Sequence, residues 1–164
     1  MFEKLSKTLE KEGFNSKIEK ATEDVPYDRL VVLFEPDSSE TKLMYEIMQI
    51  PDDDNEIENY DLIQFFVTFP FELRELNENI LADLNDLILK LNFFLPLGSY
   101  GIELEDGLAF YKYVSVTPKE KSDSDYTKLI EVLWISCYLN NTYLPVFEAI
   151  ANGDKTLEDY KDLF

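Results

Sequence analysis

The chain of 164 residues contains no histidine, one cysteine and five glycines. Histidine is the most common general base and transition-metal ligand in proteins, so its absence excludes histidine-dependent triads and the zinc sites of hydrolases. Neither a GxSxG nucleophile turn nor a glycine-rich phosphate loop is present. The single cysteine, Cys137, cannot form an intramolecular disulfide, and its apolar neighbours predict a buried thiol.

Basic residues are also scarce. The chain has 15 lysines and arginines against 34 aspartates and glutamates, which gives a net charge of -19. Such a field repels the phosphate backbone of nucleic acids and the surface of anionic membranes, because binding to either depends on lysine and arginine. We therefore expect no nucleic-acid and no membrane partner. The acidic excess fits either a basic protein partner or a role in solubility alone.

Long apolar runs are missing as well. The first thirteen residues, MFEKLSKTLEKEG, contain no apolar run of signal-peptide length. The longest uncharged segment, 132–147, includes two asparagines and a proline and is shorter than the roughly 20 apolar residues of a membrane span. These features predict a soluble, cytoplasmic protein.

What the chain does contain is apolar and aromatic material, at 45% and 14% of its residues. This amount is sufficient for the core of one domain spanning 1–164. The patterns predict a helix over 2–12 that ends at Gly13, and strands over 14–21, 29–35, 42–50 and 62–69. In the last strand, the alternation places one set of apolar side chains on the core face, namely Ile63, Phe65, Val67 and Phe69.

The second half of the chain begins with a predicted helix from about Asn77 to Asn92. Asp106-Gly107 then predicts a two-residue hairpin turn between two strands. The residues expected to face inward there are Ile102, Leu104, Leu108, Phe110, Val114 and Val116, with Tyr100, Tyr111 and Tyr113 on the other face. A long helix follows from about Ser124, with Pro145 predicting a kink or two helices near Asn140, and a short helical extension covers 156–164.

The expected fold class is α+β, an antiparallel meander packed by helices in the order α-β-β-β-β-α-β-β-α. This order, with the segments EKLSKTLEKEG, LNDLILKLN, GIELEDGLAFYKYV and the closing helix, resembles the YbjN-like family, which shares the fold of type III secretion chaperones. The resemblance implies a non-enzymatic, homodimeric module of chaperone-like or regulatory type. In the chaperones, an extended polypeptide of a protein partner wraps apolar grooves on the dimer.

The segment PDDDNEIENYD, residues 51–61, places acidic side chains at alternate positions from Asp52 to Glu58. If Asp52 is the first position of an EF-hand loop, the sixth should be glycine and the twelfth glutamate, but the chain has Ile57 and Ile63 there. No metal site is therefore expected. The segment is interpreted as a solvated loop or, alternatively, as an acidic patch that faces a partner.

The candidate partner-binding residues are Met44, Met48, Phe66, Tyr111 and Tyr113, which we expect on the sheet face away from the helices. Methionine, phenylalanine and tyrosine are enriched at interface cores, so this face predicts a dimer or peptide-binding surface. The alternative structural interpretations are that another helix covers it, or that it is simply the face of a large antiparallel sheet with scattered aromatic residues. The leading functional hypothesis is a protein-binding module without catalytic, cofactor or metal residues, and the alternative is an acidic mimic or sequestrant of a basic partner.

Overall fold

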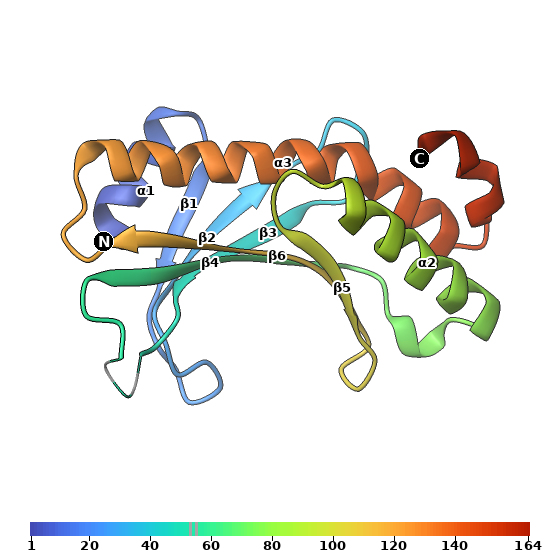
Figure 1. The fold of residues 1–164 in the computed structure, drawn as a ribbon, viewed down its shortest axis with the longest axis horizontal. Coiled ribbons are helices and arrows are strands. Elements are labelled where there is room, and N and C mark those ends of the chain that lie inside the picture. The colour runs from blue at the N-terminus through green and yellow to red at the C-terminus, as the bar shows by residue number, and fades with distance from the viewer. Residues whose placement is uncertain (53, 55) are drawn as a thin grey trace.

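The structure is a computed structural model, which describes residues 1–52, 54 and 56–164. Three α-helices, six strands and two 3-10 helices follow one another along these residues (Figure 1). Their bounds are α1 Phe2–Lys11, β1 Asn15–Glu19, β2 Arg29–Phe34, β3 Leu43–Gln49, β4 Tyr60–Phe69, η1 Leu73–Glu75, α2 Glu78–Phe94, β5 Ser99–Glu103, β6 Leu108–Pro118, α3 Asp123–Ala151 and η2 Leu157–Leu163.

All six strands form one antiparallel sheet in the order β1-β2-β3-β4-β6-β5. The first four are neighbours in the order of the chain, and β6 pairs with β4 so that β5 becomes the second edge. The predicted α+β class and the order α-β-β-β-β-α-β-β-α are confirmed. No helix in the described part of the chain is both long enough and apolar enough to cross a membrane.

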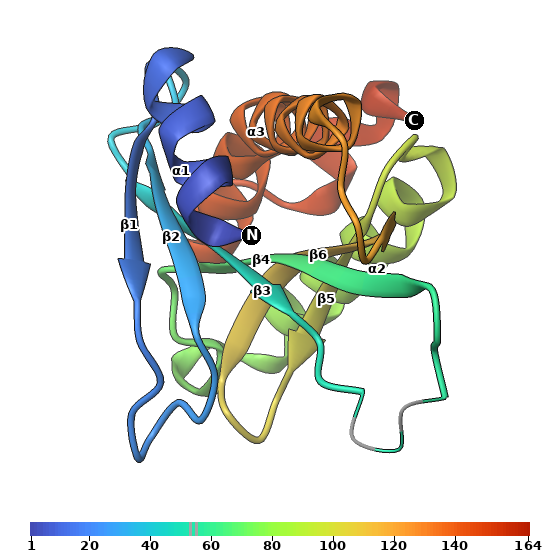
Figure 2. The same ribbon diagram turned by 90° about the vertical axis from the view of Figure 1, so that its left-hand side faces the viewer.

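Helices α1 and α3 lie on the same face of the sheet, and α2 flanks its β5 end (Figures 1 and 2). The core lies between this face and the helices. Ile63, Phe65, Val67 and Phe69 of β4 are buried there, as their alternation predicted. From the helices, leucines such as Leu9, Leu87 and Leu133 complete the core.

Side-chain caps fix where the two longer helices begin. The Asn77 side chain accepts hydrogen bonds from the backbone N–H groups of Asn79 and Ile80 at the start of α2. At the start of α3, Ser122 and Asp125 form a reciprocal capping box. Each cap satisfies backbone donors that have no partner within the helix, which explains why both helices begin close to the predicted positions.

At the other end of α2, Asn92 joins the helix to the sheet edge. Its side-chain oxygen accepts from the Tyr100 backbone N–H at 2.8 Å, and its side-chain nitrogen donates to the Tyr100 carbonyl at 2.9 Å. One amide group therefore pairs with both backbone groups of Tyr100 on β5.

The sequence predicted a kink or two helices near Asn140, and the second of these alternatives is wrong, because α3 continues through Pro145 for 29 residues. Proline lacks the N–H that would bond the carbonyl four residues earlier, here Asn141. The hydroxyl of Ser38, from the β2–β3 loop, donates to that carbonyl instead, and the Asn141 side chain accepts from the Ser38 N–H. This substitute partner lets the helix continue, although its axis turns toward α2 in its last turns (Figure 1).

The predicted two-residue turn at Asp106-Gly107 is also wrong. Glu103 pairs with Leu108, so the loop contains the four residues 104–107. Gly107 has a φ of 71°, and its carbonyl accepts from the Leu73 N–H at 3.0 Å. A positive φ is the property for which glycine is suited, so the sequence located the turn correctly but not its length.

A nearly buried ion pair joins β4 to the segment before α3. The Lys121 ammonium contacts the Asp61 carboxylate, and their side chains are 4% and 11% exposed. Lys121 also donates to the Pro118 carbonyl at 3.0 Å, and Gln49 donates to Asp61 at 2.9 Å. These contacts satisfy two charges that would otherwise be costly to bury.

We expect Lys121→Met to lower the free energy of unfolding by about 3–5 kcal/mol, because it leaves the Asp61 carboxylate buried without its cation. The double variant Lys121→Met/Asp61→Leu should regain most of this loss. Lys42→Met, which removes a largely exposed pair with Glu35, should cost less than about 1 kcal/mol. Urea unfolding of the three variants checks this, and equal losses for Lys121→Met and Lys42→Met would contradict it.

Candidate interaction surface

The face of the sheet opposite α3 has no helix over it among the described residues (Figures 1 and 2). We call it the open face. Because paired residues in neighbouring strands share a face, the strand register assigns its side chains. One row across the sheet is Arg29, Met48, Gln64 and Val114, and the next is Val31, Glu46, Phe66 and Lys112. Two further pairs are Leu33 with Met44, and Thr68 with Phe110.

The centre of the open face is apolar and packed. The rings of Phe66 and Phe110 lie 5.3 Å apart between centroids. The Phe110 ring lies over Gly101 so closely that a β-carbon at that position would overlap it. Met48 is only 9% exposed, although it does not belong to the core under the helices. The open face therefore has a small apolar cluster of its own.

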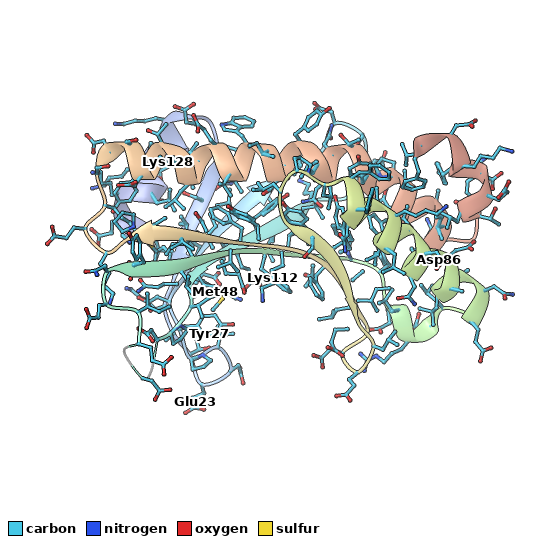
Figure 3. All side chains as sticks on the ribbon, in the orientation of Figure 1. Glu23, Tyr27, Met48, Asp86, Lys112 and Lys128 are labelled. Carbon is cyan, nitrogen blue, oxygen red and sulfur yellow. The ribbon has the colours of Figure 1, made fainter. Side chains whose placement is uncertain are left out.

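Away from this centre, the apolar side chains become accessible. Met44 is 58% exposed and Val116 is 63% exposed. In Figure 3, Met48 and Lys112 extend from the sheet on the side opposite Lys128, which lies on α3. A partner that approaches this side would meet apolar atoms before the backbone of the sheet.

The cations of the open face are partly neutralised. Arg29 donates to Glu46 at 2.7 Å and to Glu19 at 2.9 Å, so it bridges β1, β2 and β3. The hydrogen bond from Arg29 holds the pKa of the Glu19 carboxyl below its usual range. Lys17 also contacts Glu19 at 3.2 Å, so two cations and two carboxylates balance one another in this cluster.

Three loops project beyond the open face: the β1–β2 loop, the β3–β4 loop in its described part and the β5–β6 loop (Figures 1 and 2). In Figure 3, Glu23 lies at the tip of the first loop, and Tyr27 lies between it and Met48. We call these three segments the acidic loops. Their exposed carboxylates are Glu23 and Asp24, then Asp54, Glu56 and Glu58, then Glu105 and Asp106.

The structure places three of the five predicted partner-binding residues on the open face: Met44, Met48 and Phe66. The placement of Tyr111 and Tyr113 there is wrong. Tyr111 pairs with Val67 and Tyr113 with Phe65, so both face the helices.

The predicted inward set was wrong at five of its six positions. Leu108, Phe110, Val114 and Val116 alternate with the tyrosines and so lie on the open face, while Leu104 is 55% exposed in the hairpin loop. Ile102 does pack against the core. Both alternating sets of β6 mix apolar or aromatic residues with polar ones, so alternation alone did not reveal which set the helices cover.

The hydrogen bonds of the tyrosine hydroxyls explain why these tyrosines face the helices. The Tyr111 hydroxyl donates to the Leu97 carbonyl at 3.0 Å and lies 3.3 Å from the Ser136 hydroxyl. The Tyr45 hydroxyl accepts from the side-chain nitrogen of Asn140. Ser136 and Asn140 are fully buried on α3. A tyrosine ring can therefore fill the core while its polar tip meets a polar side chain of the helix.

Burial also changes the acidity of these groups. It raises the pKa of Tyr111 to about 12 and that of the Cys137 thiol to about 12. It raises the pKa of Tyr45 well above its usual value. Cys137 is buried, as the sequence predicted.

These shifts predict a loss of stability at alkaline pH. The folded state keeps these groups neutral, whereas the unfolded chain ionises the thiol near pH 9 and the phenols near pH 10. The contribution of these groups to the free energy of unfolding is complete below about pH 9 and is lost as the pH rises toward about 12. Urea unfolding at stepped pH measures this decline, and Cys137 should react with a thiol reagent only on unfolding. A flat profile with rapid labelling of the native protein would contradict it.

In the acidic segment 51–61, the Asp52 carboxylate accepts from the backbone N–H groups of Glu56 at 3.1 Å and Ile57 at 3.0 Å. It therefore stabilises its own loop. Asp53 and Asn55 lie outside the described residues. Among the residues that are described, no group of three or more acidic or cysteine side chains is arranged to hold a metal ion.

Comparison with models of known protein families gave no match to this chain, and comparison with curated proteins gave none either.

Proposed function

We propose that the protein is a non-enzymatic binding module that holds an apolar segment of a protein partner on the open face. The observation that carries this proposal is the packed pair of Phe66 and Phe110 with the buried Met48 on the same face, all outside the main core and accompanied by accessible apolar side chains. Methionine and phenylalanine are enriched at the centres of protein interfaces. Methionine, with its flexible side chain, also adapts to partners of different shape.

The acidic loops specify the partner further. A segment that binds the open face brings its flanks close to the acidic loops (Figure 1). The exposed carboxylates of these loops include Glu23, Glu56 and Asp106. Basic flanks would be attracted there and acidic flanks repelled. The proposed partner segment is therefore apolar in its middle and rich in lysine or arginine at its ends, as in the targets of a chaperone-like or regulatory module.

The open-face variants Met44→Glu and Val116→Glu test the proposal. Both residues are well exposed, so the substitutions place a charge on the binding surface without disturbing the core. We expect the native protein to enrich apolar peptides with basic flanks from a displayed random library, and each variant to bind the enriched peptides at least about tenfold more weakly. The matched control is Ile135→Glu, which adds the same charge on α3, where Ile135 is 43% exposed.

Enrichment of peptides without apolar residues, or equal weakening by Ile135→Glu, would contradict the proposal. The same measurement separates the second candidate function, an acidic sequestrant of a basic partner, which the net charge of -19 favours. A sequestrant should bind basic peptides as well or better after Met44→Glu, and its binding should disappear at high salt because exposed charges are screened. Binding through the apolar face should persist in salt.

The proposal includes a homodimer, which the resemblance implies. Leu89 and Phe93 are one turn apart on α2 and are 70% and 83% exposed, so they form a second apolar surface distinct from the open face. Association through α2 would leave the open face available.

We therefore expect light scattering to give twice the chain mass of 19.2 kDa for the native protein, and Leu89→Glu/Phe93→Glu to give the monomer mass. Because both residues are exposed, this double variant should keep the native circular dichroism spectrum. A monomeric native protein would contradict the homodimer, and a dimer that persists in the double variant would contradict the assignment of its surface.

A further inference from the structure

A groove lies on the helical side of the molecule, between the α1–β1 turn, the end of β2 with the following loop, and α3. It consists of two cavities of about 340 Å³ and about 210 Å³, which share Phe34 and Trp134 in their linings. Figure 2 shows α1 and α3 side by side on this face of the sheet, with the α1–β1 turn at the far end of α1. The groove is separate from the centre of the open face, although Leu33 lines its edge.

Four aromatic side chains line the groove: Phe14, Phe34, Trp134 and Tyr138. The rings of Phe14 and Trp134 lie 4.6 Å apart between centroids at an angle of 56°. Trp134 remains 47% exposed and Tyr138 remains 69% exposed. The groove therefore presents aromatic surface to solvent. Side chains as large as tryptophan and tyrosine are usually more deeply buried in a folded protein, so their exposure here is unusual.

Three carboxylates line the same groove: Glu12 and Glu35 in the larger cavity and Asp37 in the smaller one. Lys42 pairs with Glu35 at 2.7 Å. In the part of the chain that the structure describes, no lysine or arginine lies within ion-pair distance of Glu12 or Asp37. The groove thus combines aromatic faces with two carboxylates that have no cation of their own.

We propose that this groove binds the side chain of an arginine from a protein partner. An aromatic ring attracts a cation over its face, most strongly when the ring is tryptophan. The guanidinium group is flat and weakly hydrated, so it can stack on an indole or phenol ring while its N–H groups donate to carboxylates. A lysine ammonium lacks the flat face, and a neutral apolar group gains nothing from Glu12 and Asp37.

This site goes beyond the proposed function, because it lies apart from the apolar cluster of the open face and selects for charge and ring stacking. The groove is a second binding site for a basic protein, and it binds one particular side chain of that protein in a defined position. The acidic loops, by contrast, attract basic residues without fixing their position.

The chain itself provides the reporter for a test, since Trp134 is its only tryptophan. The probes are N-acetyl-arginine amide, the corresponding lysine compound and the corresponding citrulline compound, which has almost the shape of arginine but no charge. We expect a saturable change of tryptophan fluorescence with the arginine compound, a weaker response with lysine and none with citrulline over the same concentrations. An equal response to arginine and citrulline, or no saturable response to arginine, would overturn the proposal.

Variants then assign the response to the groove. Asp37→Asn and Tyr138→Ala change exposed side chains and should each weaken the arginine response by roughly two- to fivefold. Asp106→Asn makes the same chemical change as Asp37→Asn in the distant β5–β6 loop and should leave the response intact. Equal weakening by both aspartate variants would show general attraction to an acidic chain and reject the site. The open-face variant Val116→Glu lies on β6, outside the lining of the groove, and should leave the arginine response unchanged, so binding at the groove and binding at the open face are tested separately.

Discussion

The structure depends on how α3 packs against the sheet. This helix of 29 residues extends along most of the molecule above the strands, and fully buried side chains such as Leu133, Leu144 and Phe147 contribute to the main core (Figure 1). Polar groups fix its position: Ser136 and Asn140 meet the hydroxyls of Tyr111 and Tyr45. Because hydrogen bonds have a narrow range of distances, they define the position of a helix on a sheet more narrowly than apolar contacts alone.

The position of α3 determines what the other face of the sheet is free to do. With α3 and α1 on one side, the core is complete without any contribution from Phe66 or Phe110. Phe66 and Phe110 are therefore less important for the stability of the core than the tyrosines of β6, which face the helices. Aromatic residues at positions that the core does not need are more readily explained by binding than by stability.

The sequence was sufficient to predict every strand and α-helix in order, because strands and helices have different apolar periods and because Asn77 and Ser122 are recognisable caps. The sequence was insufficient where a local structure depends on contacts with residues far away in the chain. The face of β6 depends on its pairing with β4, and the continuity of α3 at Pro145 depends on Ser38, more than a hundred residues earlier. For the same reason, Met44, Met48 and Phe66 could be found from alternation within early strands, whereas Phe110 could not.

The aromatic groove could not be predicted from the sequence at all, because its walls come from three separate segments of the chain. Trp134 and Tyr138 fit the apolar stripe of a buried helix, and only the position of α1 and the β2–β3 loop reveals that they remain accessible. Cys137, which lies between them in the sequence, is buried, as its apolar neighbours predicted. Neighbouring positions on one helix thus belong to the core and to the surface.

The amide of Asn92 has a consequence for how a partner can approach. A peptide that extends a sheet adds itself to an edge strand by pairing with free backbone groups. On β5, the Asn92 side chain already occupies both groups of Tyr100, in the manner of a further strand. The opposite edge, β1, has five residues and carries Lys17 and Glu19, which discourage addition of another strand. Asn92 therefore blocks the addition of a strand at Tyr100, and the charged side chains of β1 disfavour it at the other edge.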